Sequence, residues 1–424
     1  MALKEYFRKP AVSYCYIYGS NSFSEWVYTF KSLFLPKMMI REDATLLYEQ
    51  KICTLTGADF SHATGSGRMA LYSILKALNF DSKDEILIPA YTCVVVPNAV
   101  LYAGLKPVYV DVDMKNFVTN LSYIRPKITI NTKVIYLQNT FGIETDLTDI
   151  VEYASQLGLW IIVDAAHGPI ISDQAKNVIR RYKKSVYFFS TDRSKYINTI
   201  LGGFLITNND ELYKTITSIN QQLNTLSKNR IIKLKVNFLI EYFFTLPLIF
   251  WFGDLILAIF KKIRLRVAFL DEKLTRMPEN YPVRISNFQS EIGLRQLDRI
   301  GRNKTYRGEM VEIYERFIGW QSLSDHTKNT NKDFLRYSFV VKNRKDLPSD
   351  FTKMFSNAFW FSSPFQGREK DFCEIFYAAG SCPNSEYLAD HIVNLPTHER
   401  INKKIVTDFL IKNGKLLREN LAID

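Results

Sequence analysis

The chain has 424 residues, of which 47% are hydrophobic and 23% are charged, and its formal net charge is +12. A chain of this length is too long for one small core and fits a large domain with a smaller one. The apolar and charged fractions are ordinary for a globular protein, so disorder is not the default expectation. The basic charge favours anionic partners, but no helix-turn-helix, zinc-finger or RNA-binding signature accompanies it. We therefore expect a phosphorylated small molecule as ligand and no nucleic acid.

Cysteine and histidine usage favours neither a disulfide framework nor a metal site. The five cysteines show no C-x-x-C or mixed Cys/His ligand spacing, and no two of the five histidines stand at a metal-ligand spacing. An odd cysteine count and the lack of an apolar leader run at the start predict reduced thiols and a cytoplasmic location.

Short runs rich in Val and Ile alternate with amphipathic stretches from residue 64 onward. We expect helices over 67–78, 95–103 and 147–156, and strands over 85–89, 108–112, 134–137, 159–163, 186–189, 203–206 and 336–341. Strands that alternate with helices predict a mostly parallel sheet with helices on both faces. Functional side chains in such folds lie at the carboxyl ends of the strands.

A very apolar segment covers residues 238–260 and has lysines and arginines on both sides. Its longest run without a charge, 242–253, is interrupted by Pro247 and is shorter than the ~20 residues of a spanning helix. Three interpretations stay open: helices buried in a dimer, a hydrophobic hairpin packed on the domain, or a patch on an anionic membrane surface with the basic flanks at the headgroups.

A lysine and an aspartate each follow a strand-like run. Asp164 ends the run 159–163, and Lys195 comes five residues after Ser190, which ends the run 186–189. Pyridoxal phosphate (PLP) needs this pair, a lysine for the Schiff base and a carboxylate that keeps the pyridine nitrogen protonated. The alternative interpretations are a surface lysine and an aspartate that caps the next turn.

The segment Thr64-Gly65-Ser66-Gly67-Arg68 opens a predicted helix and could bind a phosphate through backbone N–H groups. Ser190 would add a hydroxyl from across the sheet. Gly-rich turns that open helices are common, so the motif by itself is weak evidence.

Taken together, these motifs resemble the nucleotide-sugar aminotransferases of the DegT/StrS type, which are fold type I PLP-dependent enzymes. The matching blocks occur in the family's order: 63–71, 84–92, 107–113, 141–142, 164–167, the Ser190…Lys195…Gly202-Gly203 block, 284–298 and 388–397. The resemblance implies an α/β fold with a large domain, whose mostly parallel sheet is flanked by helices, and a smaller α+β C-terminal domain. It divides the chain into an N-terminal extension (1–45), a PLP-binding large domain (46–286) with a hydrophobic insertion at about 232–266, and a small domain (287–424).

The resemblance assigns the chemistry to named residues. Lys195 is the expected catalytic residue, and the expected cofactor-binding residues are Asp164, His167, Ser190, Ser66, Gly67, Arg68 and Cys93. His167 occupies the place near the cofactor's 3′-oxygen. Three positions depart from the family pattern: Arg68 replaces a Ser or Thr, Cys93 replaces a ring-stacking aromatic, and Pro282 replaces an asparagine that reaches the partner subunit, for which Asn280 is a possible substitute.

The function that follows is transfer of an amino group from an amino acid, such as glutamate, to a keto-sugar nucleotide by a homodimer, for cell-surface polysaccharide synthesis. A dehydration reaction is disfavoured because the relatives that perform it replace the lysine by histidine. The other alternative is a catalytically altered PLP-fold protein that acts as a membrane-associated assembly or regulatory partner. Lys195 and Asp164 speak against it, since a binding-only protein needs neither.

Overall fold

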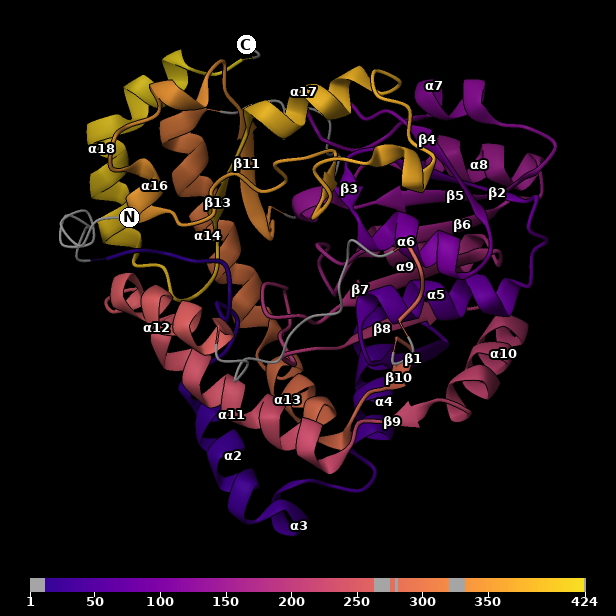
Figure 1. Ribbon diagram of the computed structural model, residues 1–424, viewed down its shortest axis with the longest axis horizontal. Helices are drawn as coiled ribbons and strands as arrows, with labels where there is room; N and C mark the ends of the chain where they lie inside the picture. Colours follow the sequence, from indigo (N-terminus) through magenta and orange to yellow (C-terminus); the bar gives the residue numbers. More distant parts are fainter. Residues whose placement is uncertain (1–11, 263–274, 279–280, 320–331, 423–424) are drawn as a thin grey trace.

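The computed structural model describes residues 12–262, 275–278, 281–319 and 332–422. A large layered unit and a smaller one lie side by side, with the helices of the N-terminal segment and of the predicted insertion below them in the view of Figure 1. The expected α/β class is therefore confirmed, with a sheet that positions the candidate site.

The large unit is built on a seven-stranded sheet. Its strands are, in spatial order, β1 (Phe60–Thr64), β8 (Gly203–Thr207), β7 (Ser185–Ser190), β6 (Trp160–Asp164), β5 (Thr132–Gln138), β2 (Glu85–Pro89) and β4 (Lys106–Val110). The five strands from β7 to β4 are parallel, whereas β8 runs antiparallel to both β7 and β1. The predicted strands in this region are present, and β1 is an additional one.

Alternation along the strands determines which helices cover each face of this sheet. On β6, Ile161 and Val163 belong to one hydrophobic cluster and Ile162 to another, because successive side chains point to opposite faces. The first cluster includes residues of α4 (Ala44–Thr56), α8 (Thr148–Gln156) and α9 (Asp173–Arg181), and the second includes residues of α5 (Gly67–Leu78), α6 (Val95–Tyr102) and α10 (Asp210–Gln221).

The smaller unit packs helices against a short antiparallel sheet. Strands β11 (Arg336–Val340) and β13 (Ile392–Pro396) pair, and α14 (Ile300–Ile318) packs on α18 (Lys403–Glu419), with α16 (Phe351–Met354) and α17 (Pro383–His391) beside them. Helix α13 (Asn287–Leu297) packs on α4 of the large unit. How the chain divides into domains stays a prediction.

Two short parallel ladders connect distant parts of the chain near the site. Strand β12 (Phe365–Gln366) of the smaller unit pairs with β3 (Thr92–Cys93), and β10 (Val283–Arg284) pairs with β9 (Asn224–Thr225). The first ladder places a loop of the smaller unit against Cys93.

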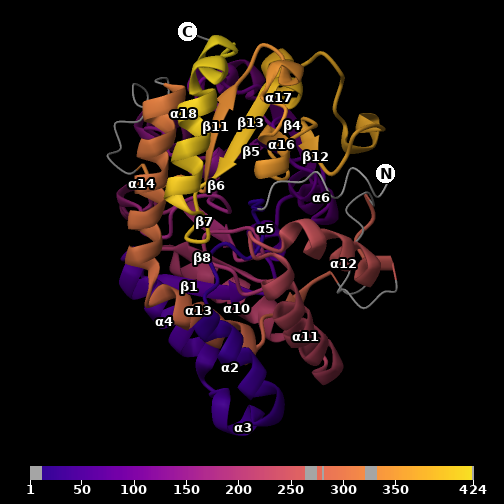
Figure 2. The ribbon, with the colours of Figure 1, turned by 90° about the vertical axis from the view of Figure 1, so that its left-hand side faces the viewer.

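The predicted insertion contains two helices, α11 (Lys228–Phe244) and α12 (Phe250–Lys262). Helix α11 lies along α2 (Phe23–Phe34) of the N-terminal segment in both views, with α3 (Pro36–Met39) following at the tip (Figures 1 and 2). Within the described residues, no helix is both long and apolar enough to cross a membrane. Residues 263–266, the end of the predicted insertion, lie outside the described part of the chain.

Candidate active site

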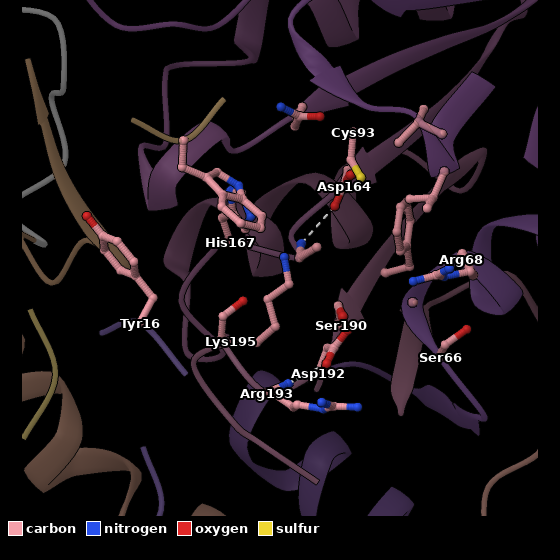
Figure 3. A pocket seen from close by; sticks show the side chains of 18 of the residues that line it. Tyr16, Ser66, Arg68, Cys93, Asp164, His167, Ser190, Asp192, Arg193 and Lys195 are labelled. Carbon is pink, nitrogen blue, oxygen red and sulfur yellow. Dashed lines mark hydrogen bonds between the residues drawn. The ribbon is translucent and has the colours of Figure 1, made fainter. Parts of the chain in front are cut away.

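A cavity of about 380 Å³ opens at the carboxyl ends of β6 and β7, between the two units. All eight residues expected from the sequence line it: Lys195, Asp164, His167, Ser190, Ser66, Gly67, Arg68 and Cys93. Figure 3 shows Ser66 and Arg68 on one side, Tyr16 on the other, and Lys195 between them. The volume of the cavity lies within the range of about 300–1,000 Å³ that is usual for small-molecule sites.

Lys195 stands on a loop held in place by its own backbone and by the N-terminal segment. The Lys195 amide donates to the carbonyl of Asp192 (3.0 Å), and Ser20 Oγ donates to the Lys195 carbonyl (2.9 Å). The Tyr18 amide binds the carbonyl of Arg193 (2.8 Å). Residues before the large unit therefore fix the loop that carries the lysine.

The Lys195 amine faces the cavity without a hydrogen-bond acceptor among the residues that the structure describes. Burial lowers its pKa, although Asp164 and Asp192 act in the opposite direction. A lower pKa increases the share of neutral amine at neutral pH, and the neutral amine is the nucleophilic form.

Asp164 ends β6 with its side chain almost completely buried. Tyr136 Oη donates to Asp164 Oδ2 (2.5 Å), and the Ala166 amide donates to Oδ1 (2.8 Å), the contact drawn dashed in Figure 3. Burial raises the pKa of this carboxyl, and the two hydrogen bonds oppose the rise because they favour the charged form. A cation placed against Asp164 would favour the carboxylate further.

The start of α5 forms the opposite end of the cavity. Ser66 caps this helix, because its hydroxyl oxygen accepts a hydrogen bond from the Met69 amide (3.3 Å), and the N–H groups at the start of α5 point out of the helix toward the cavity end. Ser190, at the end of β7, contributes its hydroxyl on this side. The N-terminus of a helix with a hydroxyl beside it suits a phosphate.

The Gly202-Gly203 pair permits this close approach of helix and sheet. A Cβ atom at Gly203 would lie 2.5 Å from the Gly67 nitrogen and 2.6 Å from the Phe189 carbonyl oxygen. Any side chain there would push the start of α5 away from β7 and β8. The second glycine of the motif is thus explained by backbone packing.

Two of the residues that depart from the family pattern, Arg68 and Cys93, line the cavity. The nitrogen-bearing end of Arg68 points toward the cavity interior, next to Ser66 (Figure 3). Cys93 Sγ lies 3.5 Å from the Gln366 carbonyl oxygen of β12. Arg68 is therefore well placed for an anion, while the thiol offers a smaller surface than an aromatic ring.

His167 is buried beside aromatic rings and accepts a hydrogen bond at Nδ1 from the Phe141 amide (3.2 Å). Burial lowers its pKa well below the ordinary range, with the charges of Lys195 and Arg336 contributing, so its imidazole is neutral. Its Nδ1 is engaged as an acceptor, which leaves Nε2 as the N–H donor.

Arg193 also lines the cavity but is ion-paired within the protein. Its Nη1 lies 3.1 Å from Glu241 Oε1 of α11, and both side chains are buried. Pro282 precedes β10, but Asn280 lies outside the described residues, so the suggested replacement of the partner-subunit asparagine stays a prediction.

Sequence reasoning missed several residues that complete the cavity wall. They are Tyr16 of the N-terminal segment, Gln138 at the end of β5, Arg336 at the start of β11, and the loop residues Asn357, Trp360 and Phe361. Tyr136, which binds Asp164, was missed as well. Two of these residues carried a signal in the sequence: Gln138 directly follows the predicted strand 134–137, and Arg336 opens the predicted strand 336–341.

Two curated relatives match the chain over a limited part of their length. The GDP-perosamine synthase of Escherichia coli O157:H7 is 30% identical over 166 residues, and the dTDP-4-amino-4,6-dideoxy-D-glucose transaminase of Shigella dysenteriae is 30% identical over 168 residues. The matches cover 39% and 40% of this chain and 45% of each relative. The chain thus spans less than half the length of these two proteins.

The fold has solved counterparts over nearly the whole chain. The crystal structure of NtdA from Bacillus subtilis with bound cofactor PMP superposes with a TM-score of 0.69 and 18% identity, covering 94% of this chain and 83% of that one. The family described as DegT/DnrJ/EryC1/StrS aminotransferases matches residues 35–236 and 264–410, which is most of the sequence. The chain therefore belongs to the DegT/DnrJ/EryC1/StrS aminotransferase family.

Proposed function

We propose that this protein is a PLP-dependent aminotransferase that moves an amino group from an amino acid, glutamate, to a keto-sugar nucleotide. The observation that carries this proposal is a single cavity with three features: the Lys195 amine, the buried Asp164 carboxyl, and the open start of α5. Family membership and the names of the two curated relatives, which both concern amino sugars carried on nucleotides, support it.

The residues present fit PLP at each of its functional groups. Burial raises the pKa of the Asp164 carboxyl, and a protonated ring nitrogen would supply the positive charge that keeps this group a carboxylate. The first turn of α5, with Ser66, Ser190 and Arg68, offers donors to a phosphate. The Lys195 amine has no hydrogen-bond acceptor among the described residues and is therefore available to react with the aldehyde of PLP.

Each residue then has a defined part in the transfer. PLP, when bound, supplies an electron sink and carries the amino group between the two half-reactions. Asp164, held by Tyr136 and the Ala166 amide, keeps the proton on the ring nitrogen. Once the donor's amine has displaced it, the Lys195 amine would take a proton from the amino-donor carbon and deliver it to the cofactor carbon that carries the transferred nitrogen, for which a lowered pKa is favourable.

The homodimer and the role in cell-surface polysaccharide synthesis are further parts of the proposal. Both derive from the family resemblance. Identification of the product sugar nucleotide tests the pathway, and a solution mass measurement tests the dimer.

Contact with an anionic membrane surface is the second candidate property, and exposed apolar stripes favour it. Helix α2 presents Phe23, Phe30 and Phe34, and α11 presents Ile232, Val236 and Phe243, at helical spacing. Trp26 joins the two stripes, since its ring packs on Phe243 and its Nε1 donates to the Leu239 carbonyl (3.0 Å). Exposed Lys31 and Lys233 lie on the same two helices, exposed Lys37 lies on the adjoining α3, and all three suit anionic headgroups.

The first experiment is an absorption spectrum of the full-length protein with added PLP. We expect a band at roughly 410–430 nm from the lysine-linked cofactor, which glutamate bleaches. Lys195→Ala should lack the band, and Lys184→Ala, a change of an exposed lysine outside the cavity, should keep it. Absence of the band in the unmodified protein at high PLP would contradict the proposal and favour the non-catalytic alternative.

A further inference from the structure

Residues 13–21 form a strap along the loop that carries Lys195. Tyr16 and Ile17 of this strap line the cavity itself. Three backbone carbonyls of the loop accept hydrogen bonds from the strap: that of Arg193 from the Tyr18 amide (2.8 Å), that of Lys195 from Ser20 Oγ (2.9 Å), and that of Asn198 from Asn21 Nδ2 (3.2 Å). The position of the strap therefore determines the position of the lysine loop and of part of the cavity wall.

Helix α11 of the insertion contacts both the strap and the lysine loop through one carboxylate. Glu241 accepts a hydrogen bond from Tyr18 Oη (2.7 Å) and pairs with Arg193 Nη1 (3.1 Å), and all three side chains are buried. The turn that follows α11 adds a further contact, because the Ser13 amide donates to the Pro247 carbonyl (3.0 Å). Since breaking a buried ion pair is costly, we expect the strap, the loop and α11 to move together.

The two faces of α11 have different surroundings. Glu241 shares the buried face with Phe238, whereas Val236 and Phe243 are exposed on the opposite face. Helix α11 lies along α2 (Figures 1 and 2), where the ring of Trp26 packs on that of Phe243 with their centroids 5.0 Å apart. A surface that binds the exposed residues of both helices therefore favours the arrangement with α11 against α2. This is the arrangement in which Glu241 reaches the lysine loop.

We propose that contact of α2 and α11 with an anionic membrane strengthens the binding of PLP at Lys195. Both ligands favour the same conformation, because the membrane needs α11 beside α2, and PLP needs the strap and the lysine loop in place. Two such ligands raise each other's affinity by the same factor, typically about 5–150-fold. The inference rests on the proposed function, since it supposes that Lys195 holds PLP and that the two helices bind a membrane. The protein then retains its cofactor best where it is bound to a membrane.

The test measures this coupling in both directions on the unmodified, full-length protein. PLP is titrated at its absorption band with and without vesicles of phosphatidylglycerol and phosphatidylcholine, lipids that have no primary amine to react with PLP. Vesicle affinity is measured by co-sedimentation with and without PLP. We expect each ligand to raise the affinity for the other about fivefold or more, and by the same factor in both directions. Pure phosphatidylcholine vesicles should give a smaller change, because they lack the charge that the basic side chains bind.

Variants of the buried connection test whether it carries the coupling. Glu241→Gln removes the charge that joins α11 to the lysine loop and leaves the exposed residues of α2 and α11 unchanged. It should still bind vesicles, but the coupling factor should fall to about one. Tyr18→Phe removes only the second hydrogen bond to Glu241 and should lower the factor in part. Asp210→Asn is the matched control, because it changes an exposed carboxylate that pairs with Lys214 on α10, and it should keep the full factor.

The outcomes separate this inference from the proposals on which it rests. A normal PLP band and normal vesicle binding, with neither affinity changed by the other ligand, would overturn this inference alone. An unchanged coupling factor in Glu241→Gln would also overturn it, because the effect would not pass through the buried carboxylate. A missing band at high PLP would reject the aminotransferase, and a lack of vesicle binding would reject the membrane contact. The inference fails in either of these two cases.

Discussion

Arg193 Nη1 lies 3.1 Å from Glu241 Oε1, so the loop that carries Lys195 is ion-paired with the hydrophobic insertion. Tyr18 of the N-terminal segment donates to the same carboxylate from its hydroxyl (2.7 Å). Helix α11 is thus part of the support of the active site as well as a surface element. Deleting residues 238–260 would remove Glu241 and disturb the site, so deletion does not test membrane contact cleanly.

We expect Glu241→Ala to reduce the free energy of unfolding by about 3–5 kcal/mol, because it leaves a buried guanidinium without its partner. Urea unfolding followed by circular dichroism measures this change. Asp210→Ala is the control, since the ion pair between Asp210 and Lys214 is exposed and such pairs contribute less than about 1 kcal/mol. Similar effects of the two changes would mean that the buried pair contributes little.

Tyr136→Phe tests the hydrogen bond that holds Asp164. Burial raises the pKa of Asp164 and the Tyr136 hydroxyl opposes the rise, so its removal should raise this pKa further. The carboxylate is then lost at a higher pH, and the acid limb of the glutamate half-reaction should move upward. A charged hydrogen bond of about 1.5–3 kcal/mol corresponds to a roughly ten- to hundredfold loss at low pH.

Tyr187→Phe is the matched control for this experiment, because the Tyr187 hydroxyl is also buried on the sheet but binds no partner among the described side chains. Its pH profile should follow that of the unmodified protein. Coincident profiles of the Tyr136 variant and the unmodified protein would show that the hydroxyl does not act on Asp164 during the reaction.

The strands and their end residues were accessible from the sequence because they depend on local pattern. Runs such as 159–163 are continuously apolar since both faces of a parallel strand are buried, and Asp164 follows directly. Strand β1 has the sequence FSHAT, which lacks such a run because it is the edge strand of the sheet, and it was missed. This segment is a strand because its backbone pairs with β8, and its own residues do not indicate that pairing.

Residues that reach the cavity from distant segments could not be predicted in this way. Tyr16 and Arg336 are separated by more than three hundred positions, and only the packing of the smaller unit brings the guanidinium over the ring. The Arg193–Glu241 pair likewise joins a site loop to an insertion. Local periodicity predicts a strand at 336–341 but contains no information about what its first side chain faces.

His398 provides a pH-dependent test of the packing between the N-terminal segment and the smaller unit. Its Nε2 lies 2.7 Å from the Cys15 carbonyl oxygen, and burial lowers its pKa to about 3. The unfolded chain therefore binds this proton more readily, with a pKa near 6.5, and stability is lost as pH falls below that value. At pH 5 the loss amounts to about 2 kcal/mol relative to pH 7.

The comparison with His398→Gln isolates this contribution. Glu49 and Glu144, whose pKa values burial raises to about 7, act in the opposite direction in both proteins and cancel in the difference. The stability advantage of the unmodified protein over the variant should shrink by about 2 kcal/mol between pH 7 and pH 5. Parallel curves of unfolding free energy against pH would show that His398 does not stay neutral in the fold.

Membrane contact is tested by changing exposed side chains of α2 and leaving α11 intact. Phe30→Ser with Phe34→Ser removes two exposed rings, of which Phe34 is 69% exposed, so the fold should be retained. Binding to phosphatidylserine-containing vesicles should fall roughly tenfold for each phenylalanine removed, because each buries apolar area in the membrane. Co-sedimentation measures the bound fraction, and neutral phosphatidylcholine vesicles should bind less of the unmodified protein.

Ile130→Ser is the control for this change, since Ile130 is 92% exposed and lies in the large unit, away from both stripes. Its vesicle binding should equal that of the unmodified protein. If the double variant binds vesicles unchanged but shifts from dimer to monomer in sedimentation, the apolar stripes form an interface between two copies of the chain. In that case the basic side chains of α2 and α11 would be solvent-exposed surface residues, and the proposal of membrane contact would be abandoned.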